Sequence, residues 1–180
     1  MTRPLLVLVG PPGAGKTSVG RAVARLLGVG FRDTDHDVQR AAGKPVPDIF
    51  LDDGEPAFRA LEQAAVADAL AGHDGVLALG GGAVEDPVTR GLLAGHRVVY
   101  LQVGLADAAR RVGFARDRPM LALNPRAHLR MLMDQRHPRY VEVAAVEVAT
   151  DGRSVGDVAA EVAAWTVVAM AVLHKAPESP

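Results

Sequence analysis

Short apolar runs, separated by longer amphipathic segments, set the pattern of hydrophobic and polar positions along this chain. Four of them lie at residues 5–9, 76–79, 97–103 and 143–150, and a shorter, more polar one lies at 30–33. Uninterrupted apolar runs of this length are typical of strands that are covered on both faces, as in a parallel sheet. We therefore predict an α/β fold in which a five-stranded parallel sheet lies between two layers of helices.

Apolar residues recur every three or four positions in the segments between these runs. In residues 17–27, for example, Val19, Val23 and Leu27 fall on one side of a helix. This spacing predicts helices that each turn one apolar face to the sheet. The predicted helices cover residues 17–27, 35–42, 46–51, 55–70, 87–93, 105–112, 124–137 and 154–173.

One segment, residues 113–123, has no apolar period and is rich in Gly, Arg, Asp and Pro. Because it lies between two predicted helices, we interpret it as a mobile lid over a site. No repeat or linker divides the chain, and its length suits one hydrophobic core. We predict a single domain over residues 1–174, followed by a disordered tail at 175–180.

The first predicted strand runs directly into Gly-Pro-Pro-Gly-Ala-Gly-Lys-Thr at residues 10–17, which fits the phosphate-loop pattern. Its glycines let several backbone N–H groups face one point, and the following helix adds its positive dipole end. Lys16 would reach the β- and γ-phosphates of ATP, and the Thr17 hydroxyl would bind Mg²⁺. The alternative is a glycine-rich turn that contains Lys-Thr by chance, but the buried strand before it favours nucleotide binding. The predicted ATP contacts here are Gly13, Ala14, Gly15, Lys16, Thr17 and Ser18.

The composition is that of a globular protein whose core is built mainly from Ala, Val and Leu, since aromatic residues make up only 4% of the chain. The net charge of −1 gives no general attraction to nucleic acid or to an anionic membrane. The chain has no Cys, which excludes disulfides and cysteine catalysis, and we expect it to be cytoplasmic. We expect the apolar stripe of the last helix, with Trp165, Val168 and Met170, to face the core, a partner surface being the alternative.

Two carboxylates follow the second predicted strand, in Asp33-Thr34-Asp35. Open parallel sheets bind ligands at the carboxyl ends of their strands, so both acids should lie near the phosphate loop. We expect one of them to face the metal and phosphates and the other to face an acceptor hydroxyl, which a carboxylate can orient and deprotonate. The structural alternative is that Asp35 only caps the next helix.

The third predicted strand ends in Gly80-Gly81-Gly82, where many phosphate-loop enzymes carry an acidic metal ligand. Three successive glycines would let a small substrate approach backbone N–H groups closely, although a plain turn is the alternative.

Arginine makes up most of the basic residues, and Arg59, Arg118 and Arg136 lie near the other candidate segments. Arg suits bidentate binding of carboxylate and phosphate, but each of these could equally be a solvated surface charge. The six His show no metal-ligand spacing, so no zinc site is predicted.

Together these motifs resemble the shikimate kinase family over almost the whole chain. The specific matches are Asp-Thr-Asp at 33–35, Asp-Ile-Phe at 48–50, Phe-Arg at 58–59, Leu-Gly-Gly-Gly-Ala at 79–83, Arg-Pro-Met-Leu at 118–121 and Arg-His-Pro-Arg-Tyr at 136–140. The resemblance implies a three-layer P-loop fold with strand order 2-3-1-4-5 and a mobile lid. It also implies ATP-dependent transfer of the γ-phosphate to the 3-hydroxyl of shikimate, giving shikimate 3-phosphate, in chorismate and aromatic amino-acid biosynthesis.

On the acceptor side, the resemblance implies that Asp35 holds shikimate hydroxyls and acts as the base for the 3-hydroxyl. Arg59 and Arg136 would clamp the shikimate carboxylate. The pocket would be completed by Phe50, Phe58, Gly80, Gly81 and Gly82.

On the donor side, the resemblance implies that Asp33 supports Mg²⁺ beside Thr17. Arg118 would move in with the lid and act with Lys16 on the transferring phosphoryl group. Arg111 and Arg153 would lie on the adenine side of ATP. We expect the enzyme to be a monomer that binds neither nucleic acid nor a membrane.

The sequence departs from the family pattern at Arg139, where Leu is usual, and in the segment 121–126 after the lid motif. Two alternatives remain open. One is a related kinase that phosphorylates another polyol acid, such as gluconate, or a cyclitol. The other is a nucleotide-binding module without catalysis, against which stands the joint presence of Lys16, Thr17, Asp33, Asp35 and Arg118.

Overall fold

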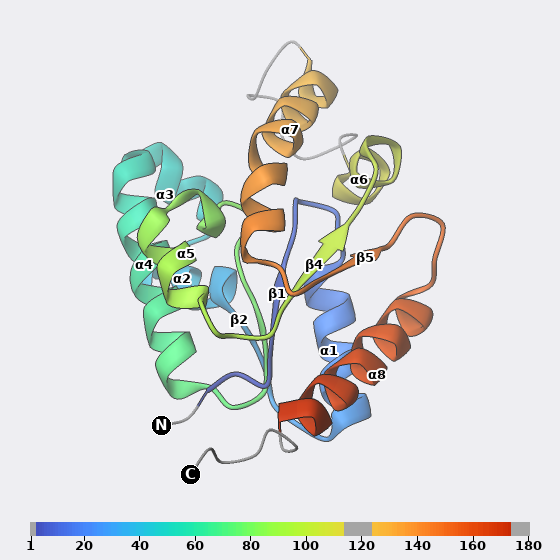
Figure 1. Cartoon of the computed structure of the whole chain (residues 1–180). Helices are drawn as coiled ribbons and strands as arrows, with labels where there is room; N and C mark the ends of the chain where they lie inside the picture. Colours follow the sequence, from blue (N-terminus) through green and yellow to red (C-terminus); the bar gives the residue numbers. More distant parts are fainter. Residues whose placement is uncertain (1–2, 114–123, 174–180) are drawn as a thin grey trace.

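A five-stranded sheet occupies the middle of the molecule in the computed structural model, which describes residues 3–113 and 124–173 (Figure 1). All strand pairs are parallel, and the strand order is β2-β3-β1-β4-β5. The predicted fold class and strand order are therefore confirmed. The strands are β1 (Leu6–Val9), β2 (Phe31–Asp33), β3 (Val76–Ala78), β4 (Val98–Gln102) and β5 (Val146–Ala149).

Helices connect successive strands, because a parallel pair needs a crossover connection. Every helix predicted from the apolar spacing is present, and its ends agree within two residues except at the C-terminal end of α7. The helices are α1 (Lys16–Leu27), α2 (Thr34–Ala42), α3 (Val46–Asp52), α4 (Gly54–Gly72), the 3₁₀ turn η1 (Ala83–Glu85), α5 (Pro87–Leu93), α6 (Leu105–Val112), α7 (Pro125–Val143) and α8 (Val155–Leu173).

The two faces of the sheet carry separate hydrophobic clusters, because successive side chains of a strand point to opposite faces. On one face, Leu8 packs with residues of α1 and α8, such as Val23 and Val162. On the other face, Val7 packs with residues of α4, α5 and α7, such as Val66. Figure 1 shows these two helical layers on either side of the sheet.

A smaller cluster lies away from the sheet, where α2, α3 and α4 meet. It consists of Val38, Ile49 and Phe58, all buried. This cluster fixes the position of α4, the helix that carries Arg59.

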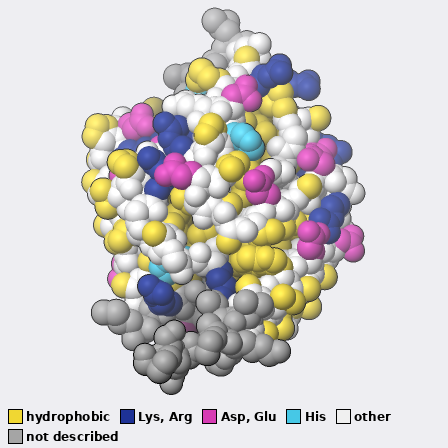
Figure 2. Space-filling view, in the orientation of Figure 1, with side chains coloured by type: hydrophobic (Ala, Val, Ile, Leu, Met, Phe, Trp, Pro, Cys, Tyr) yellow, Lys and Arg dark blue, Asp and Glu magenta, His cyan; other side chains and the backbone are white. Residues whose placement is uncertain are grey.

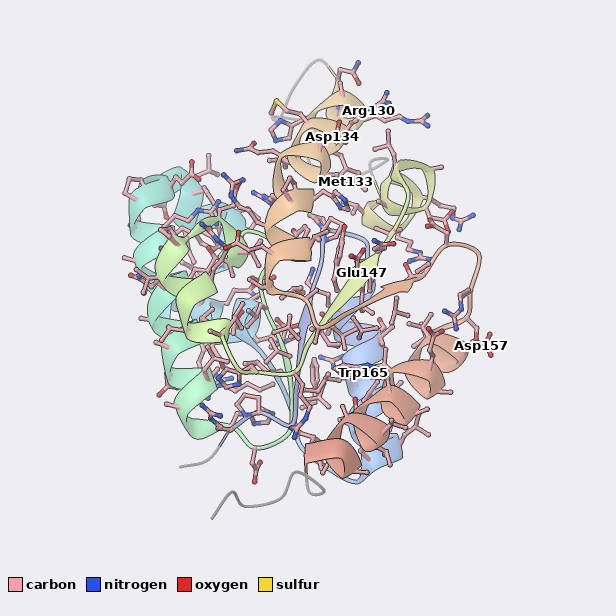
Figure 3. The ribbon with its side chains drawn as sticks, in the orientation of Figure 1. Arg130, Met133, Asp134, Glu147, Asp157 and Trp165 are labelled. Carbon is pink, nitrogen blue, oxygen red and sulfur yellow. The ribbon has the colours of Figure 1, made fainter. Side chains whose placement is uncertain are left out.

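The last helix is less buried than predicted. Trp165, labelled in Figure 3, packs against the cluster shared with α1, but Val168 and Met170 are 62% and 36% exposed. The buried side of α8 is defined by Val158 and Val162. A helix on a sheet buries only one face, so the expectation of a core position is wrong for Val168 and Met170.

The helix α7 runs through Pro138, whereas the sequence predicted an end near residue 137, with resumption after Pro138 as the alternative. A proline inside a helix removes one hydrogen bond and costs about 3 kcal/mol. The buried residues Arg136 and Tyr140 lie on either side of it and anchor the helix to the rest of the fold. We attribute the continuity of α7 to these tertiary contacts.

Gly113 ends α6 with a left-handed φ of 66°, and the predicted lid begins at this residue. Residues 114–123 of the predicted lid, including Arg118, and the predicted tail at 175–180 lie outside the described residues. The single domain over residues 1–174 stays a prediction.

Acidic and basic side chains are interspersed over the described part of the face drawn in Figure 2. None of the helices within residues 3–113 and 124–173 combines the length and apolar character needed to cross a membrane.

Candidate active site

The loop between β1 and α1 depends on glycine for close contact with its neighbours. Gly13 has a φ of 81°, and a Cβ added to it would lie 2.8 Å from the carbonyl oxygen of Ala108 in α6. Gly15 has a φ of 89° and begins α1 as its N-cap. Left-handed φ values are readily adopted only by glycine. The loop therefore brings its backbone close to α6 and directs the N-terminus of α1 into the site.

Lys16 is folded back over this loop. Its Nζ donates hydrogen bonds to the carbonyl oxygens of Gly10, at 2.7 Å, and Pro11, at 3.2 Å. Desolvation lowers the pKa of Lys16, and the negative charges of Asp35 and Asp33 oppose that shift. The present hydrogen-bond acceptors of the ammonium group are neutral carbonyl oxygens. A charged phosphate oxygen would be a stronger acceptor than these.

The two aspartates after β2 have different roles. Asp33 caps α2 by accepting a hydrogen bond from the backbone N–H of Asp35, at 3.1 Å, and its other oxygen accepts one from the Thr17 hydroxyl, at 2.7 Å. The helix cap is thus Asp33, and the alternative that Asp35 serves only as a cap is wrong. Burial raises the pKa of Asp35, and the nearby Lys16 opposes the shift.

These groups line one cavity of about 480 Å³ at the carboxyl ends of the strands. Asp33 and Asp35 share it with the phosphate loop. All predicted nucleotide contacts within the described residues line it, namely Gly13, Ala14, Gly15, Lys16, Thr17, Ser18, Arg111 and Arg153.

Arg111 connects the phosphate loop to the residue after β5 at the edge of this cavity. Its guanidinium donates hydrogen bonds to the Gly13 carbonyl oxygen, at 3.2 Å, and to the hydroxyl and carbonyl oxygens of Thr150, at 3.0 and 2.7 Å. Arg153 follows on the same side and pairs with Glu161, at 2.6 Å. Sequence reasoning missed Thr150, although its place directly after β5 was a signal.

The predicted acceptor arginines are held by carboxylates. Arg59 lies 2.6 Å from Glu62 and 3.1 Å from Glu55 in ion pairs on α4. Arg136, from the distant helix α7, is buried and lies 3.1 Å from Glu85. Glu85 is also 3.6 Å from Arg59, so it joins the two arginines.

Sequence reasoning missed Glu62 and Glu85. Glu62 stands three positions after Arg59, a spacing that favours side-chain contact on a helix. Desolvation raises the pKa of Glu62, and Arg59 opposes the shift. Glu85 had no such local signal, because its partner Arg136 is 51 residues away.

The glycine run after β3 gives room to these side chains. A Cβ on Gly80 would lie 2.6 Å from an Asp35 carboxyl oxygen and 2.8 Å from one of Glu62. A Cβ on Gly82 would collide with the Arg59 guanidinium. The Gly80 N–H also donates to the Thr34 hydroxyl, at 3.0 Å, so this N–H is already bonded within the protein. Glycine is therefore favoured at these positions by the packing of protein side chains, in addition to the predicted approach of a substrate.

Tyr140 fixes the middle of the same run. Its buried hydroxyl donates a hydrogen bond to the Gly81 carbonyl oxygen, at 2.6 Å, and its ring stacks on Tyr100 with 5.0 Å between centroids. Burial raises the pKa of Tyr140, so the hydroxyl keeps its proton. Sequence reasoning placed Tyr140 in a motif without giving it this contact.

The two predicted phenylalanines differ in burial. Phe58 is buried with Val38 and Ile49, and the Arg59 guanidinium lies 5.3 Å from its ring centroid. Phe50 is 38% exposed, with its ring 4.5 Å from that of Phe58. Phe58 thus supports Arg59, and Phe50 continues the apolar surface outward.

A phosphate-binding loop that shares its cavity with a buried carboxylate, on a parallel sheet covered by helices, defines a P-loop phosphotransferase. Residues 12–166 match the family model described as shikimate kinase. The chain belongs to the shikimate kinase family. The predicted family, the enzyme class and ATP-dependent phosphorylation of shikimate are therefore confirmed.

Individual relatives agree with this placement. A shikimate kinase from Salinispora arenicola is 62% identical over 161 residues, which cover 89% of this chain and 96% of the relative. A solved shikimate kinase from Acinetobacter baumannii, in complex with shikimate, has a TM-score of 0.84 and 34% identity, covering 98% of this chain and 97% of that one.

A gluconokinase from Sinorhizobium meliloti shares the fold with a TM-score of 0.55 and 20% identity, over 94% of each chain. At that identity the likeness concerns the fold alone, and it gives no support to the gluconate alternative.

Proposed function

We propose that this cavity transfers the γ-phosphate of ATP to the 3-hydroxyl of shikimate, with Asp35 as the base and Arg59 and Arg136 as the carboxylate clamp. The observation that carries these residue roles is that Asp35 lines the same cavity as Lys16. The two arginines, from α4 and α7, meet at Glu85 just beyond the glycine run. Gly80 lies between the two groups, because a Cβ on it would approach both Asp35 and Glu62, the ion-pair partner of Arg59.

On the donor side, the backbone N–H groups of residues 13–18 and the ammonium group of Lys16 bind the phosphates. Lys16 exchanges its bonds to two carbonyl oxygens for bonds to phosphate oxygens. Arg111 and Arg153 bound the cavity on the side of the nucleoside. We keep Arg118 as the residue that neutralises charge on the transferring phosphoryl group; it lies outside the described residues.

Thr17 and Asp33 fit a Mg²⁺ site. The Thr17 hydroxyl directs its hydrogen to Asp33, which leaves its oxygen lone pairs free for a metal ion. Within the described residues, no group of three or more His, Cys, Asp or Glu is arranged to hold a metal. Mg²⁺ suits such a sparse oxygen site, because it keeps water and phosphate ligands. When bound, the ion would neutralise charge on the β- and γ-phosphates.

On the acceptor side, Asp35 accepts the proton of the 3-hydroxyl as the hydroxyl oxygen bonds to the γ-phosphorus. The bond between that phosphorus and the bridging oxygen breaks, and ADP leaves. Burial raises the pKa of Asp35, and a base with a raised pKa accepts a proton more readily. Arg59 and Arg136 hold the carboxylate of the acceptor, which fixes the ring and selects the hydroxyl that reacts.

We also propose that the enzyme acts as a monomer in the cytoplasm.

The test is a coupled ADP-release assay with ATP, Mg²⁺ and a panel of acceptors: shikimate, its methyl ester and gluconate. We expect turnover with shikimate, a large loss with the ester and no turnover with gluconate. Phosphorus NMR of the product should show phosphate on the 3-hydroxyl. Equal turnover of acid and ester would contradict the arginine clamp, and phosphate on another hydroxyl would contradict the role of Asp35.

A further inference from the structure

Glu85 occupies a fixed position at the end of η1, directly beyond the glycine run. Its backbone N–H donates to the Gly82 carbonyl oxygen, at 2.9 Å. Its own carbonyl oxygen accepts a hydrogen bond from Arg90, at 3.0 Å. The main chain of Glu85 is therefore held on both sides, and its side chain reaches the acceptor arginines.

A single oxygen of Glu85 joins both arginines. Its Oε2 lies 3.1 Å from a guanidinium nitrogen of Arg136 and 3.6 Å from one of Arg59. The Nε of Arg136 is buried and has no hydrogen-bond partner among the described residues. The side chain of Arg136 is only 9% exposed, so water does not replace that partner easily. The arginine pair thus already binds the carboxylate of Glu85, and the Nε–H of Arg136 remains available as a further donor.

Glu85 is not needed to keep Arg59 in place. Arg59 already pairs with Glu62, at 2.6 Å, and with Glu55, at 3.1 Å, and its distance to Glu85 is the longest of the three. Glu85 is therefore dispensable for holding Arg59, and its carboxylate competes with any other carboxylate brought to the two arginines. Two carboxylates at one site repel each other at close range.

We propose that Glu85 is a specificity-determining residue that occupies the arginine pair in the ligand-free enzyme and yields it to the carboxylate of the acceptor. This inference rests on the proposed function, because it takes the acceptor to be a carboxylic acid. Between turnovers Glu85 pairs with Arg136, and it weakens the binding of every carboxylate. Only an acid that gains further contacts, such as hydroxyl bonds to Asp35, displaces it.

The test is Glu85→Gln, which keeps the shape and removes the charge. Isothermal titration without nucleotide measures the affinity for shikimate and for its methyl ester, which carries no carboxylate charge. We expect Glu85→Gln to bind shikimate about threefold to tenfold more tightly than the wild type. Binding of the ester should change less than twofold, because the ester does not compete for the arginines.

Asp68→Asn is the matched control. Asp68 loses the same single charge and lies on the surface, 76% exposed and 2.6 Å from Arg32. We expect it to leave both affinities unchanged. Thermal unfolding of each variant checks folding, and Glu85→Asp, whose carboxylate is one methylene further from the arginines, replaces Glu85→Gln if that variant does not fold.

Weaker or unchanged shikimate binding in the folded variant, or an equal gain with acid and ester, would overturn the proposal. Wild-type turnover separates this failure from that of the proposed function. If the wild type phosphorylates shikimate and Glu85→Gln shows no tighter binding, only the role of Glu85 is lost. If the wild type does not phosphorylate shikimate, both are lost.

Discussion

The proposed donor and acceptor sides of this site differ in the groups that form them. The donor side is mostly main chain: residues 12–17 line the cavity, and Lys16 supplies the cation within this loop. The acceptor side is a network of side chains in which Arg59 and Arg136 alternate with Glu62 and Glu85. Glycines serve both sides, by approaching α6 in the first case and by making room for charged side chains in the second.

This difference determines how each side tolerates change. Backbone groups persist through most substitutions, so phosphate binding depends on loop geometry more than on any one side chain. In the acceptor network the charges are paired, so removing Arg59 leaves the buried Glu62 without its cation. Charged hydrogen bonds contribute about 1.5–3 kcal/mol each, so such losses are felt in affinity.

The largest effect is expected for Lys16→Ala on the donor side. We expect kcat to fall about 10³-fold or more, because the phosphate loop has no other cation to stabilise the charge on the γ-phosphate in the transition state. ATP should still bind, since the backbone N–H groups remain. Single-turnover ADP release and titration with ATP measure the two effects. Lys44→Ala is the control, because Lys44 pairs with Asp52 and Asp53 away from the cavity. Complete loss of ATP binding in Lys16→Ala would show that the donor side is not mainly main chain.

Asp35→Asn, at the boundary of the two sides, should have the next largest effect. We expect kcat to fall about 10²- to 10⁴-fold, the usual contribution of a general base, with ATP affinity nearly unchanged. A steady-state assay and an ATP titration measure both quantities. An equal loss of turnover and of ATP affinity would argue against a role for Asp35 as the base.

The pH dependence gives a second test of Asp35. Because burial raises its pKa in the folded state, the wild-type activity should fall, with decreasing pH, at a higher pH than expected for an ordinary Asp. The folded state also binds this proton more tightly than the unfolded state, so ionised Asp35 lowers stability above its folded pKa. Asp35→Asn should therefore raise Tm at neutral pH, which thermal unfolding would show. An unchanged or lower Tm would mean that contacts to the ionised carboxylate offset its burial.

On the acceptor side, Arg136→Lys should raise the KM for shikimate about 10-fold or more, with a smaller change in kcat. A planar fork that can bind a carboxylate through two nitrogens becomes a point charge. Arg130→Lys on the same helix is the control, since Arg130 is exposed and is labelled on α7 in Figure 3. The KM of Arg130→Lys should equal that of the wild type, and a similar rise in both variants would remove Arg136 from the clamp.

The sequence predicts the donor side better than the acceptor side, because the donor side is formed by a local segment and the acceptor side by contacts between distant segments. The five strands and the phosphate loop follow from local patterns, so their positions could be predicted within a few residues. The position of Asp35 after the second strand placed it near the phosphate loop, but the specific roles of Asp35, Arg59 and Arg136 came from a family resemblance. Glu85 depends on a partner 51 residues away, and no local pattern indicates such a contact. The glycines at residues 80–82 show the same limit of sequence-based prediction. They indicate that neighbouring groups approach the backbone closely, but they do not indicate which side chains those groups are.

Tyr140→Phe should have the smallest effect, because it removes one hydroxyl and leaves the stacked ring in place. The change leaves the Gly81 carbonyl oxygen without its 2.6 Å donor, which should cost about 1–3 kcal/mol of unfolding free energy. We expect the KM for shikimate to rise about twofold to fivefold and the KM for ATP to stay constant, because the freed glycine run borders Asp35 and Arg59 rather than the phosphate loop. Tyr100→Phe is the control for a lost tyrosine hydroxyl, since its hydroxyl contacts His137 and not the glycine run. A rise in both KM values would mean that the glycine run supports the two sides alike, and the contrast between them would then be weaker than the contacts indicate.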